Sequence, residues 1–365
     1  MYICRKKYAM SIFKFKQTGR ISLFDKNETS EKLSKLGNPL EKLHNVIDFE
    51  MFRAVLEENM LNHEKKSNAG QKPYDVIMMF KIILLKRFYN LSDEQAEYQI
   101  NDRLSFKEFL GLSSGDRIPD SRTIWLFQEN MIQKNLEEKL FEQFRQYLYD
   151  LGLYVNEGKI VDASFVEVPR QRNKKEENAK IKAGEGEELW NDKPKKKSQK
   201  DIDARWTEKG GQKYYGYKDH AKIDAKSKLI DTYEVTSAAV HDSQPIEELL
   251  RESDKGQELY ADSAYIGEPI DTMLRGKEIV PQIIERAVKG KPLTEEQKEN
   301  NHIKSKVRCL CEHVFGFITN SMNDFYINSI GLIRAKGIIG LINLLYNMCR
   351  YEQIVRLNLL PIKKV

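Results

Sequence analysis

The stretch Leu259-Tyr260-Ala261-Asp262-Ser263-Ala264-Tyr265 is a short apolar run that ends on a carboxylate and then turns. An aspartate at the end of a buried strand is costly to desolvate unless it is paired with a positive charge or bound to a metal ion. We therefore expect Asp262 to have partners elsewhere in the chain, and its position indicates an acidic site at a strand end.

Two further carboxylates occur in comparable surroundings. Asp162 lies in the apolar, strand-like run 159–166, and Glu312 lies in the segment 308–316, whose apolar residues have helical periodicity. Three carboxylates, two on strands and one on a helix, suit a hard, oxygen-liganded cation such as Mg²⁺. Because paired Mg²⁺ ions can hold both the attacking and the leaving oxygen of a phosphoryl displacement, these three residues indicate phosphodiester chemistry.

The composition is that of a globular protein with a charged surface. The chain has 365 residues, of which 40% are hydrophobic and 32% charged, and it is long enough for two or three domains. It has no apolar run of about 18 residues, and its first ten residues lack the apolar core of a secretory signal, so we expect neither a transmembrane helix nor export. The four cysteines are too few and too unevenly spaced for a disulfide framework, which favours reduced thiols in a cytoplasm.

The net charge of +5 is concentrated in one segment. Residues 170–200 contain eleven Lys or Arg and six Asp or Glu, an excess of five that equals the excess of the whole protein. A localised basic stretch predicts contacts with DNA phosphates, for which Arg170 and Arg172 are candidates. A solvated, flexible insertion explains the same composition, and the segment is too polar to be expected to fold by itself.

The N-terminal part of the chain is predicted to be helical. After an extended arm over residues 1–39, a helical domain is expected over 40–152, with helices at 40–61, 74–89, from 92, at 106–112, from 121 and at 134–151. The helix that Asp120 or Ser121 caps presents Arg122 and Thr123 in its first turn. This polar, basic helix start suits a helix-turn-helix-like DNA reader. An ordinary helical bundle in which Arg122 is simply exposed is the alternative.

From Lys159 onward, strands dominate. They are expected at 159–168, 214–224, 229–238, 259–262 and 278–284, with helices at 243–250 (capped by Asp242 or Ser243), 268–274, around Glu312 and at 332–357. This order is ribonuclease-H-like. The predicted fold is therefore an N-terminal helical DNA-binding region followed by a ribonuclease-H-like α/β domain at 153–357. A basic insertion at 170–205 follows the first strand, and 358–365 form a tail.

The helix that bears Glu312 also carries Arg308, four residues earlier and so on the same helical face. A neighbouring apolar stripe would dock this helix on the sheet and bring Glu312 to the strand ends. Alternatively, Glu312 is a surface residue paired with Arg308. Lys218 and His220 alternate on one expected strand and are candidates for contacts with DNA phosphates, although a solvated strand face fits them equally well.

Several motifs together resemble a known family. They are Ile160-Val161-Asp162-Ala163-Ser164, Tyr215-Gly216-Tyr217-Lys218-Asp219-His220, Thr236-Ser237-Ala238-Ala239-Val240-His241-Asp242, Tyr260-Ala261-Asp262-Ser263-Ala264-Tyr265 and Glu312-His313-Val314-Phe315-Gly316. With these motifs, and with residues 91–95 and 118–123 in the helical part, the chain resembles insertion-sequence transposases of the DDE class, specifically the IS5-type family. The similarity extends from about Leu40 to Tyr351.

The resemblance implies that Asp162, Asp262 and Glu312 are the three catalytic, metal-binding acids. It implies two Mg²⁺ ions, for which Mn²⁺ can substitute, with one activating water and the other stabilising the leaving 3′-oxygen. Arg308 matches the family's arginine and is implied to contact DNA. Ser305 stands where the family signature has tyrosine, and Thr319 stands where it has lysine, two departures that would weaken the grip on DNA.

The implied substrates are double-stranded DNAs, namely the terminal inverted repeats of the protein's own element and a target. Because two ends must be brought together, the resemblance implies a homodimer or higher oligomer on DNA, in the cytosol of a bacterium or archaeon. Two rival functions remain open at this stage. One is a transposase-derived DNA-binding protein without chemistry, and the other is a Mg²⁺-dependent nuclease that cleaves without joining.

Overall fold

The structure is a computed structural model that describes residues 25–61, 72–113, 115–288, 290–322 and 325–363. Most of the expected N-terminal arm, with Cys4, lies outside these residues. The end of that arm is not extended, since Asp25–Lys35 form helix α1.

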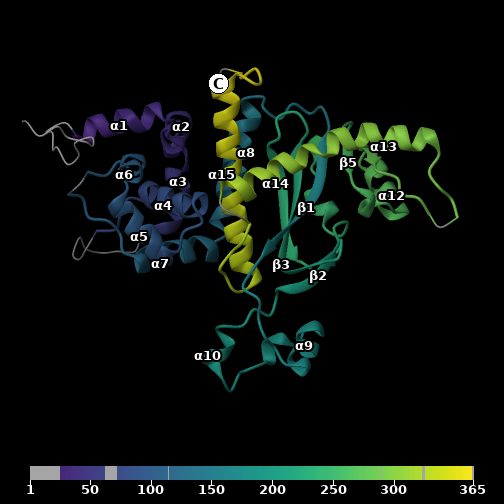
Figure 1. Cartoon of the computed structure of the whole chain (residues 1–365), viewed down its shortest axis with the longest axis horizontal. Coiled ribbons are helices and arrows are strands. Elements are labelled where there is room, and N and C mark those ends of the chain that lie inside the picture. The colour runs from purple at the N-terminus through teal and green to yellow at the C-terminus, as the bar shows by residue number, and fades with distance from the viewer. Residues whose placement is uncertain (1–24, 62–71, 114, 289, 323–324, 364–365) are drawn as a thin grey trace, which may run out of the picture.

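The N-terminal region is helical, as predicted (Figure 1). Its further helices are α2 (Pro39–Val46), η1 (Phe49–Phe52), α3 (Arg53–Met60), α4 (Val76–Phe88), α5 (Asp93–Asp102), α6 (Leu104–Leu110), α7 (Ser121–Gln133) and α8 (Leu136–Asp150). The single helix expected at 40–61 is divided, because the backbone is extended at Ile47 and the Asp48 side chain caps η1 by accepting from Glu50 N at 3.0 Å. The expected start of α5 is confirmed by a capping box between Ser92 and Gln95.

The sheet has the predicted ribonuclease-H-like topology. Its strands are β1 (Lys159–Glu167), β2 (Arg205–Lys209), β3 (Gln212–Asp224), β4 (Ile230–Ser237), β5 (Glu258–Ala261) and β6 (Val280–Ile283). Strands β4, β3 and β1 are antiparallel neighbours, and β1, β5 and β6 follow in parallel. The short strand β2 pairs with the first half of β3 and was not predicted. Helix α12 (Glu268–Gly276) connects β5 to β6, and the four-residue α11 (Ile246–Leu249) precedes β5.

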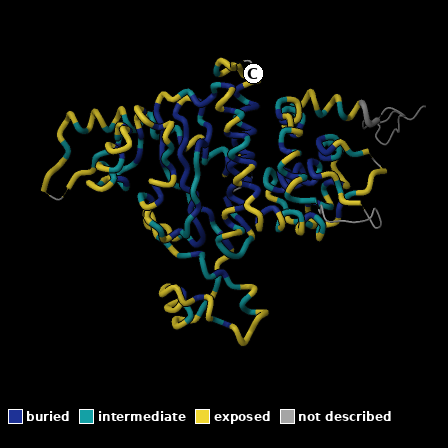
Figure 2. Tube along the Cα trace, turned by 180° about the vertical axis from the view of Figure 1, so that it is seen from behind, coloured by how far each residue is buried: buried dark blue, intermediate teal, exposed yellow. Residues whose placement is uncertain are grey.

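Helix α15 (Leu332–Leu357) joins the two regions. It lies between the N-terminal helices and the sheet, and most of its residues are buried (Figures 1 and 2). It is long and apolar enough to cross a membrane, but 78% of its apolar 18-residue stretch is buried inside the protein, as in a core helix. Buried side chains of the helical region, α15 and the sheet belong to one hydrophobic cluster, so the two regions share a core.

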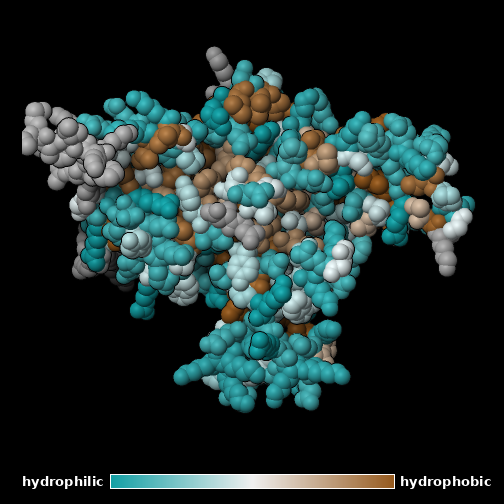
Figure 3. Space-filling view, in the orientation of Figure 1, coloured by the Kyte–Doolittle hydropathy of each residue, from teal (hydrophilic) through white to brown (hydrophobic). Residues whose placement is uncertain are grey.

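The basic insertion forms a small lobe that projects from the body (Figure 1) and has a hydrophilic surface (Figure 3). It contains α9 (Lys175–Lys182), η2 (Gly186–Glu188) and α10 (Pro194–Lys197). The Trp190 side chain is only 8% exposed, and its Nε1 donates to Glu177 Oε1 at 2.8 Å. Lys196 Nζ donates to the same oxygen at 2.7 Å. The expectation that this segment is too polar to fold is therefore wrong, because one aromatic ring and one carboxylate organise it.

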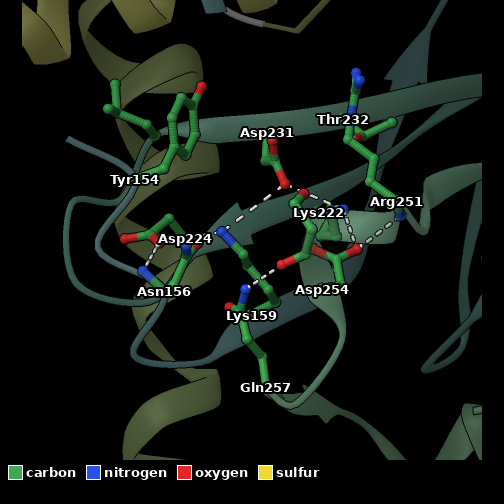
Figure 4. A network of polar contacts seen from close by, with 12 residues as sticks. Tyr154, Asn156, Lys159, Lys222, Asp224, Asp231, Thr232, Arg251, Asp254 and Gln257 are labelled. Atoms are coloured by element: carbon green, nitrogen blue, oxygen red, sulfur yellow. Dashed lines mark hydrogen bonds and ion pairs between the residues drawn. The ribbon is translucent and has the colours of Figure 1, made fainter. Parts of the chain in front are cut away.

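A buried network of charges fixes the strand ends far from the lobe (Figure 4). Lys159 on β1 pairs with Asp224 on β3 at 3.2 Å, and Lys222 on β3 pairs with Asp231 on β4 at 3.1 Å. Arg145 of α8 reaches Asp231 at 3.2 Å and so ties the helical region to the sheet. Loss of one partner would leave a buried charge uncompensated. A change of strand register would separate these partners, so the network stabilises the observed register.

A candidate active site at the ends of two parallel strands

Asp162 and Asp262 come from neighbouring parallel strands. In the β1–β5 pair, Lys159 lies opposite Leu259 and Ile160 opposite Tyr260. The same register, continued by two residues, places Asp162 beside Asp262, which directly follows β5. Asp262 Oδ1 accepts from Ala264 N at 2.8 Å and so caps the short helix η4 (Ser263–Tyr265). The expected meeting of the two aspartates is therefore built into the strand pairing.

Asp162 has three hydrogen-bond donors. Its Oδ2 accepts from Arg308 Nη1 at 3.0 Å and from Cys311 Sγ at 2.9 Å, and its Oδ1 accepts from Ala163 N at 2.9 Å. Burial raises the pKa of Asp162 and the negative charge of Asp262 adds to the rise, while the hydrogen bonds from Cys311 and Ala163 and the charge of Arg308 oppose it. Partners from elsewhere in the chain were expected for Asp262, but the distant donors Arg308 and Cys311 bind Asp162 instead, and the hydrogen bond described for Asp262 is the local one from Ala264 N.

Glu312 is held differently. Helix α13 (Glu295–Arg308) and helix α14 (Leu310–Ser321) are separate elements that meet at Cys309, where a loop and one helix were expected. Val314 and Ile318 dock α14 in the core, as its apolar stripe predicted. The Glu312 side chain remains 68% exposed, and its Oε1 lies 3.6 Å from Arg308 Nη2. The docking of α14 brings Arg308 and Cys311 into contact with Asp162. Glu312 is linked to Asp162 through Arg308, with which both carboxylates pair.

The carboxylates of Asp162, Asp262 and Glu312 are suitable ligands for a divalent cation, although their side chains do not converge on one point. In the part of the chain that the structure describes, no three His, Cys, Asp or Glu side chains converge to hold a metal ion. The donor set of Asp162, Asp262 and Glu312 nevertheless consists of the hard oxygen ligands that Mg²⁺ or Mn²⁺ prefers. The Arg308 guanidinium between two of them also shows that this place accommodates a positive charge.

Cys311 is a site residue that the sequence interpretation missed. Its thiol is buried, and burial together with the Asp162 charge raises the pKa of the thiol, so it donates as a neutral group. Cys311 lies three residues before Val314 and so on the apolar face of the helix, and this spacing could have predicted its burial. Tyr265 is fully buried nearby, and its hydroxyl has no partner among the described residues. Its ring packs in the same small hydrophobic cluster as Val161 and Ala261, the residues that precede the two aspartates.

Lys218 and His220 are not on an exposed strand face. The Lys218 side chain is 8% exposed, and its Nζ pairs with Asp242 Oδ1 at 2.7 Å. His220 is fully buried, with Nε2 2.8 Å from Thr236 Oγ1, and burial lowers its pKa to about 4, so it is neutral at pH 7. Both positions argue against direct contacts with DNA phosphates. The expectation that Asp242 or Ser243 caps the helix before β5 is also wrong, because α11 begins after Pro245 without a side-chain cap.

The other candidate DNA contacts are on the surface. Asp120 Oδ1 accepts from Thr123 N at 2.7 Å and caps α7 as predicted, which leaves Arg122 exposed in the first turn. Arg170 and Arg172 are exposed at the base of the lobe, where the Arg170 guanidinium lies 5.5 Å from the ring centre of Trp206. The structure does not bring these groups together with the acidic site.

Comparisons with known proteins identify the family of the chain. Residues 28–130 match the family described as Transposase domain (DUF772), and residues 155–348 match the family described as Transposase DDE domain. A solved structure of the piggyBac transposase synaptic complex with hairpin DNA is similar, with 9% sequence identity and a TM-score of 0.43, over 91% of this chain and 78% of that chain. The second family spans more than half of the chain and contains Asp162, Asp262 and Glu312. The protein therefore belongs to the DDE transposase family, whose members are DNA transposases that generally use divalent metal ions.

Proposed function

We propose that this transposase binds the terminal inverted repeats of its own insertion sequence and catalyses Mg²⁺-dependent strand cleavage and strand transfer. The observation that carries the proposal is the placement of Asp162 beside Asp262 at the ends of two parallel strands, with Glu312 on a helix docked against them. The IS5-type assignment belongs to the same proposal and rests on the motifs in the sequence.

The catalytic roles follow from the donor set. Asp162, Asp262 and Glu312 would hold the divalent ions, which when bound activate the attacking oxygen and stabilise the leaving 3′-oxygen. Mg²⁺ is the proposed ion, and Mn²⁺ is expected to substitute for it. Arg308, beside Asp162 and Glu312, would bind a phosphate of the cleaved strand, because a guanidinium pairs with phosphate as well as with carboxylate.

The DNA contacts are proposed on two surfaces. The start of α7, with Arg122 and Thr123, would contact the repeat, and the lobe, with Arg170, Arg172 and its lysines, would contact phosphates through its excess of positive charge. A homodimer or higher oligomer is proposed because two DNA ends must meet. A cytosolic location near the nucleoid follows from such a substrate.

Two features favour a second candidate, a transposase-derived protein that binds DNA without cutting it. Arg308 occupies the place of a cation beside Asp162, and Ser305 and Thr319 replace two residues of the family signature. Against this candidate, all three acids are present. A nuclease that cleaves without joining differs from the main proposal only in lacking a strand-transfer product.

The test is nicking and joining of a duplex that carries the element's own flanking repeat, with Mg²⁺. Wild type is compared with Asp262→Asn and with Asp271→Asn, the same chemical change on α12 outside the site. We expect cleaved and joined products from wild type and from Asp271→Asn, and none from Asp262→Asn. Binding without cleavage by wild type would support the second candidate, and cleavage without joined molecules would support the nuclease. Absence of binding would overturn all three functions.

A further inference from the structure

A cleft of about 910 Å³ lies away from the three acids. Its walls come from the N-terminal helices α4, α5 and α7, from the base of the lobe at residues 168–171 and 199–201, and from the segment 328–338 that leads into α15. In Figure 3 the surface is notched between the helical region and the lobe. We propose that this cleft binds an unpaired nucleotide of the DNA end. The inference rests on the proposed function and adds a subsite to it.

The cleft is within reach of a strand that occupies the acidic site. Strand β1 runs from Asp162 toward Val168, which lines the cleft, so six residues of extended chain separate the two. At about 3.3 Å per residue this distance is roughly 20 Å. Since one strand of DNA advances about 3.4 Å per nucleotide, the cleft would receive a nucleotide roughly six positions from the one at Asp162.

One wall offers a stacking surface beside an amide. The Trp125 side chain is 47% exposed in the cleft, and Gln128 lies one turn further along the same face of α7. Gln128 Oε1 accepts from Lys86 Nζ at 2.8 Å, while its amide N–H groups form no hydrogen bond within the described residues. An indole face stacks on any base, and an amide is suited to hydrogen bonding with a base edge.

The cleft also has an incompletely satisfied cation. Arg87 Nε is buried and has no partner among the described residues, and the contact of its Nη2 with Gln128 Oε1 is long, at 3.4 Å. The three acids of the cleft are already committed, since Asp93 pairs with Lys86, Glu129 binds Arg334 at 2.8 Å and Asp201 accepts from the Tyr217 hydroxyl at 2.7 Å. A buried donor without an acceptor is costly, so an anionic group such as a phosphate would stabilise Arg87.

The size and chemistry of the cleft favour one nucleotide over other ligands. Its volume lies within the range of about 300 to 1,000 Å³ for small-ligand sites, whereas a duplex is too wide to enter. A base edge is accessible inside such a cleft only when the base is unpaired. Stacking ring, amide and guanidinium together match the base and phosphate of a single nucleotide.

The experiment measures how the full-length protein binds two forms of the repeat duplex, by fluorescence anisotropy. One form has a blunt end, and the other carries a single-stranded extension of about eight nucleotides with 2-aminopurine at the sixth, the position that the reach along β1 indicates. We expect wild type to bind the extended form about tenfold more tightly and to quench the 2-aminopurine. Trp125→Ala should lose the quenching and most of the preference while binding the blunt duplex unchanged, and Trp125→Phe should retain both effects.

A control variant separates the cleft from aromatic residues in general. Tyr98→Ala removes a ring that is 69% exposed on α5 and does not line the cleft, so it should behave as wild type. Equal binding of the two duplexes by wild type, or equal weakening of both by Trp125→Ala, would overturn the inference while leaving the proposed function standing. Failure to bind either duplex would instead overturn the proposed function and the inference with it.

Discussion

Arg308 donates from Nη1 to Asp162 Oδ2 at 3.0 Å, and its Nη2 lies 3.6 Å from Glu312 Oε1. One guanidinium therefore pairs with two of the three acids and offsets one of their two negative charges. Arg308 is the last residue of α13, a helix without a fully buried residue, so its position depends on few packing contacts. A metal ion that binds Asp162 Oδ2 would compete with this arginine.

The first prediction follows from that competition. Arg308→Gln should bind Mn²⁺ at least about tenfold more tightly than wild type in the absence of DNA, because a hydrogen bond to a charged group stabilises by roughly 1.5–3 kcal/mol. Isothermal titration calorimetry measures the affinity directly. Lys306→Gln removes a neighbouring exposed charge of the same helix and should leave it unchanged. Equal affinity of wild type and Arg308→Gln would show that the guanidinium does not compete with the metal.

The second prediction concerns stability and pH. Asp219 on β3 is fully buried and accepts from Asn343 Nδ2 of α15 at 3.2 Å, while Asp219 Oδ2 and Asn343 Oδ1 have no partner among the described residues. Burial raises the pKa of Asp219 from 3.8 to about 7. Because the unfolded chain loses this proton first, the folded state loses stability as the pH rises from about 4 to about 7.

Asp219→Asn removes the titration and supplies an amide donor for the pair with Asn343. We expect the free energy of unfolding of wild type to fall, relative to this variant, by up to about 1.4 kcal/mol per pH unit within that window. Urea unfolding at pH 4.5, 6 and 7.5 measures the difference. Parallel pH profiles for the two proteins would contradict the raised pKa.

The third prediction concerns the sequence motif Tyr215-Gly216-Tyr217. Gly216 has φ +150°, and a Cβ there would lie 2.2 Å from the backbone oxygen of Val166 on β1. Gly216→Ala should therefore separate β3 from β1 and lower the free energy of unfolding by about 3 kcal/mol or more. Gly276→Ala is the matched control, since nothing lies within 4 Å of its added Cβ. Denaturant midpoints that shift equally in both variants would refute the close approach.

The fourth prediction concerns the lobe. Trp190→Ala removes the ring that Glu177, Lys196 and Lys200 surround, so the lobe should unfold while the body keeps its melting temperature within about 2 °C. Limited proteolysis should then cut between residues 170 and 205 at least about tenfold faster than in wild type. An exposed ring provides the comparison, because Trp206→Ala should leave the cleavage rate within the lobe unchanged. Resistance of Trp190→Ala to protease would mean that other contacts hold the lobe.

The sequence was sufficient for those parts of the fold that depend on local pattern. Apolar runs bounded by turns identified five of the six strands, and uninterrupted apolar periodicity identified α15 with the bounds observed. The pairing of Asp162 with Asp262 followed from topology, since parallel neighbours with acids at equivalent positions must present them together. The strand β2 was not predicted, because Trp206 is its single large hydrophobic residue and so no alternating apolar pattern marks it.

Features that depend on contacts between residues far apart in the sequence could not be predicted from the spacing of residue types along the chain. Alternation on β3 suggested an exposed face for Lys218, but Asp242, from beyond β4, folds over it and forms an ion pair. The Trp190–Glu177 contact that organises the lobe has no periodic signature. The contact of Arg308 with Asp162 likewise joins residues 146 positions apart, and it forms where α13 ends and meets α14 at Cys309.

The lobe leaves and rejoins the body at one place. Asp201 N donates to Gln171 Oε1 at 3.0 Å, and Lys200 Nζ donates to the backbone oxygen of Arg172 at 2.8 Å, so the two ends of the insertion run side by side. Such an insertion is a detachable module. Between these two ends the length and charge of the insertion could change without moving the acids, provided that Asp201 keeps its hydrogen bond from Tyr217 on β3. Under the proposed function, such a change would alter the DNA contacts of the protein and leave its chemistry as it is.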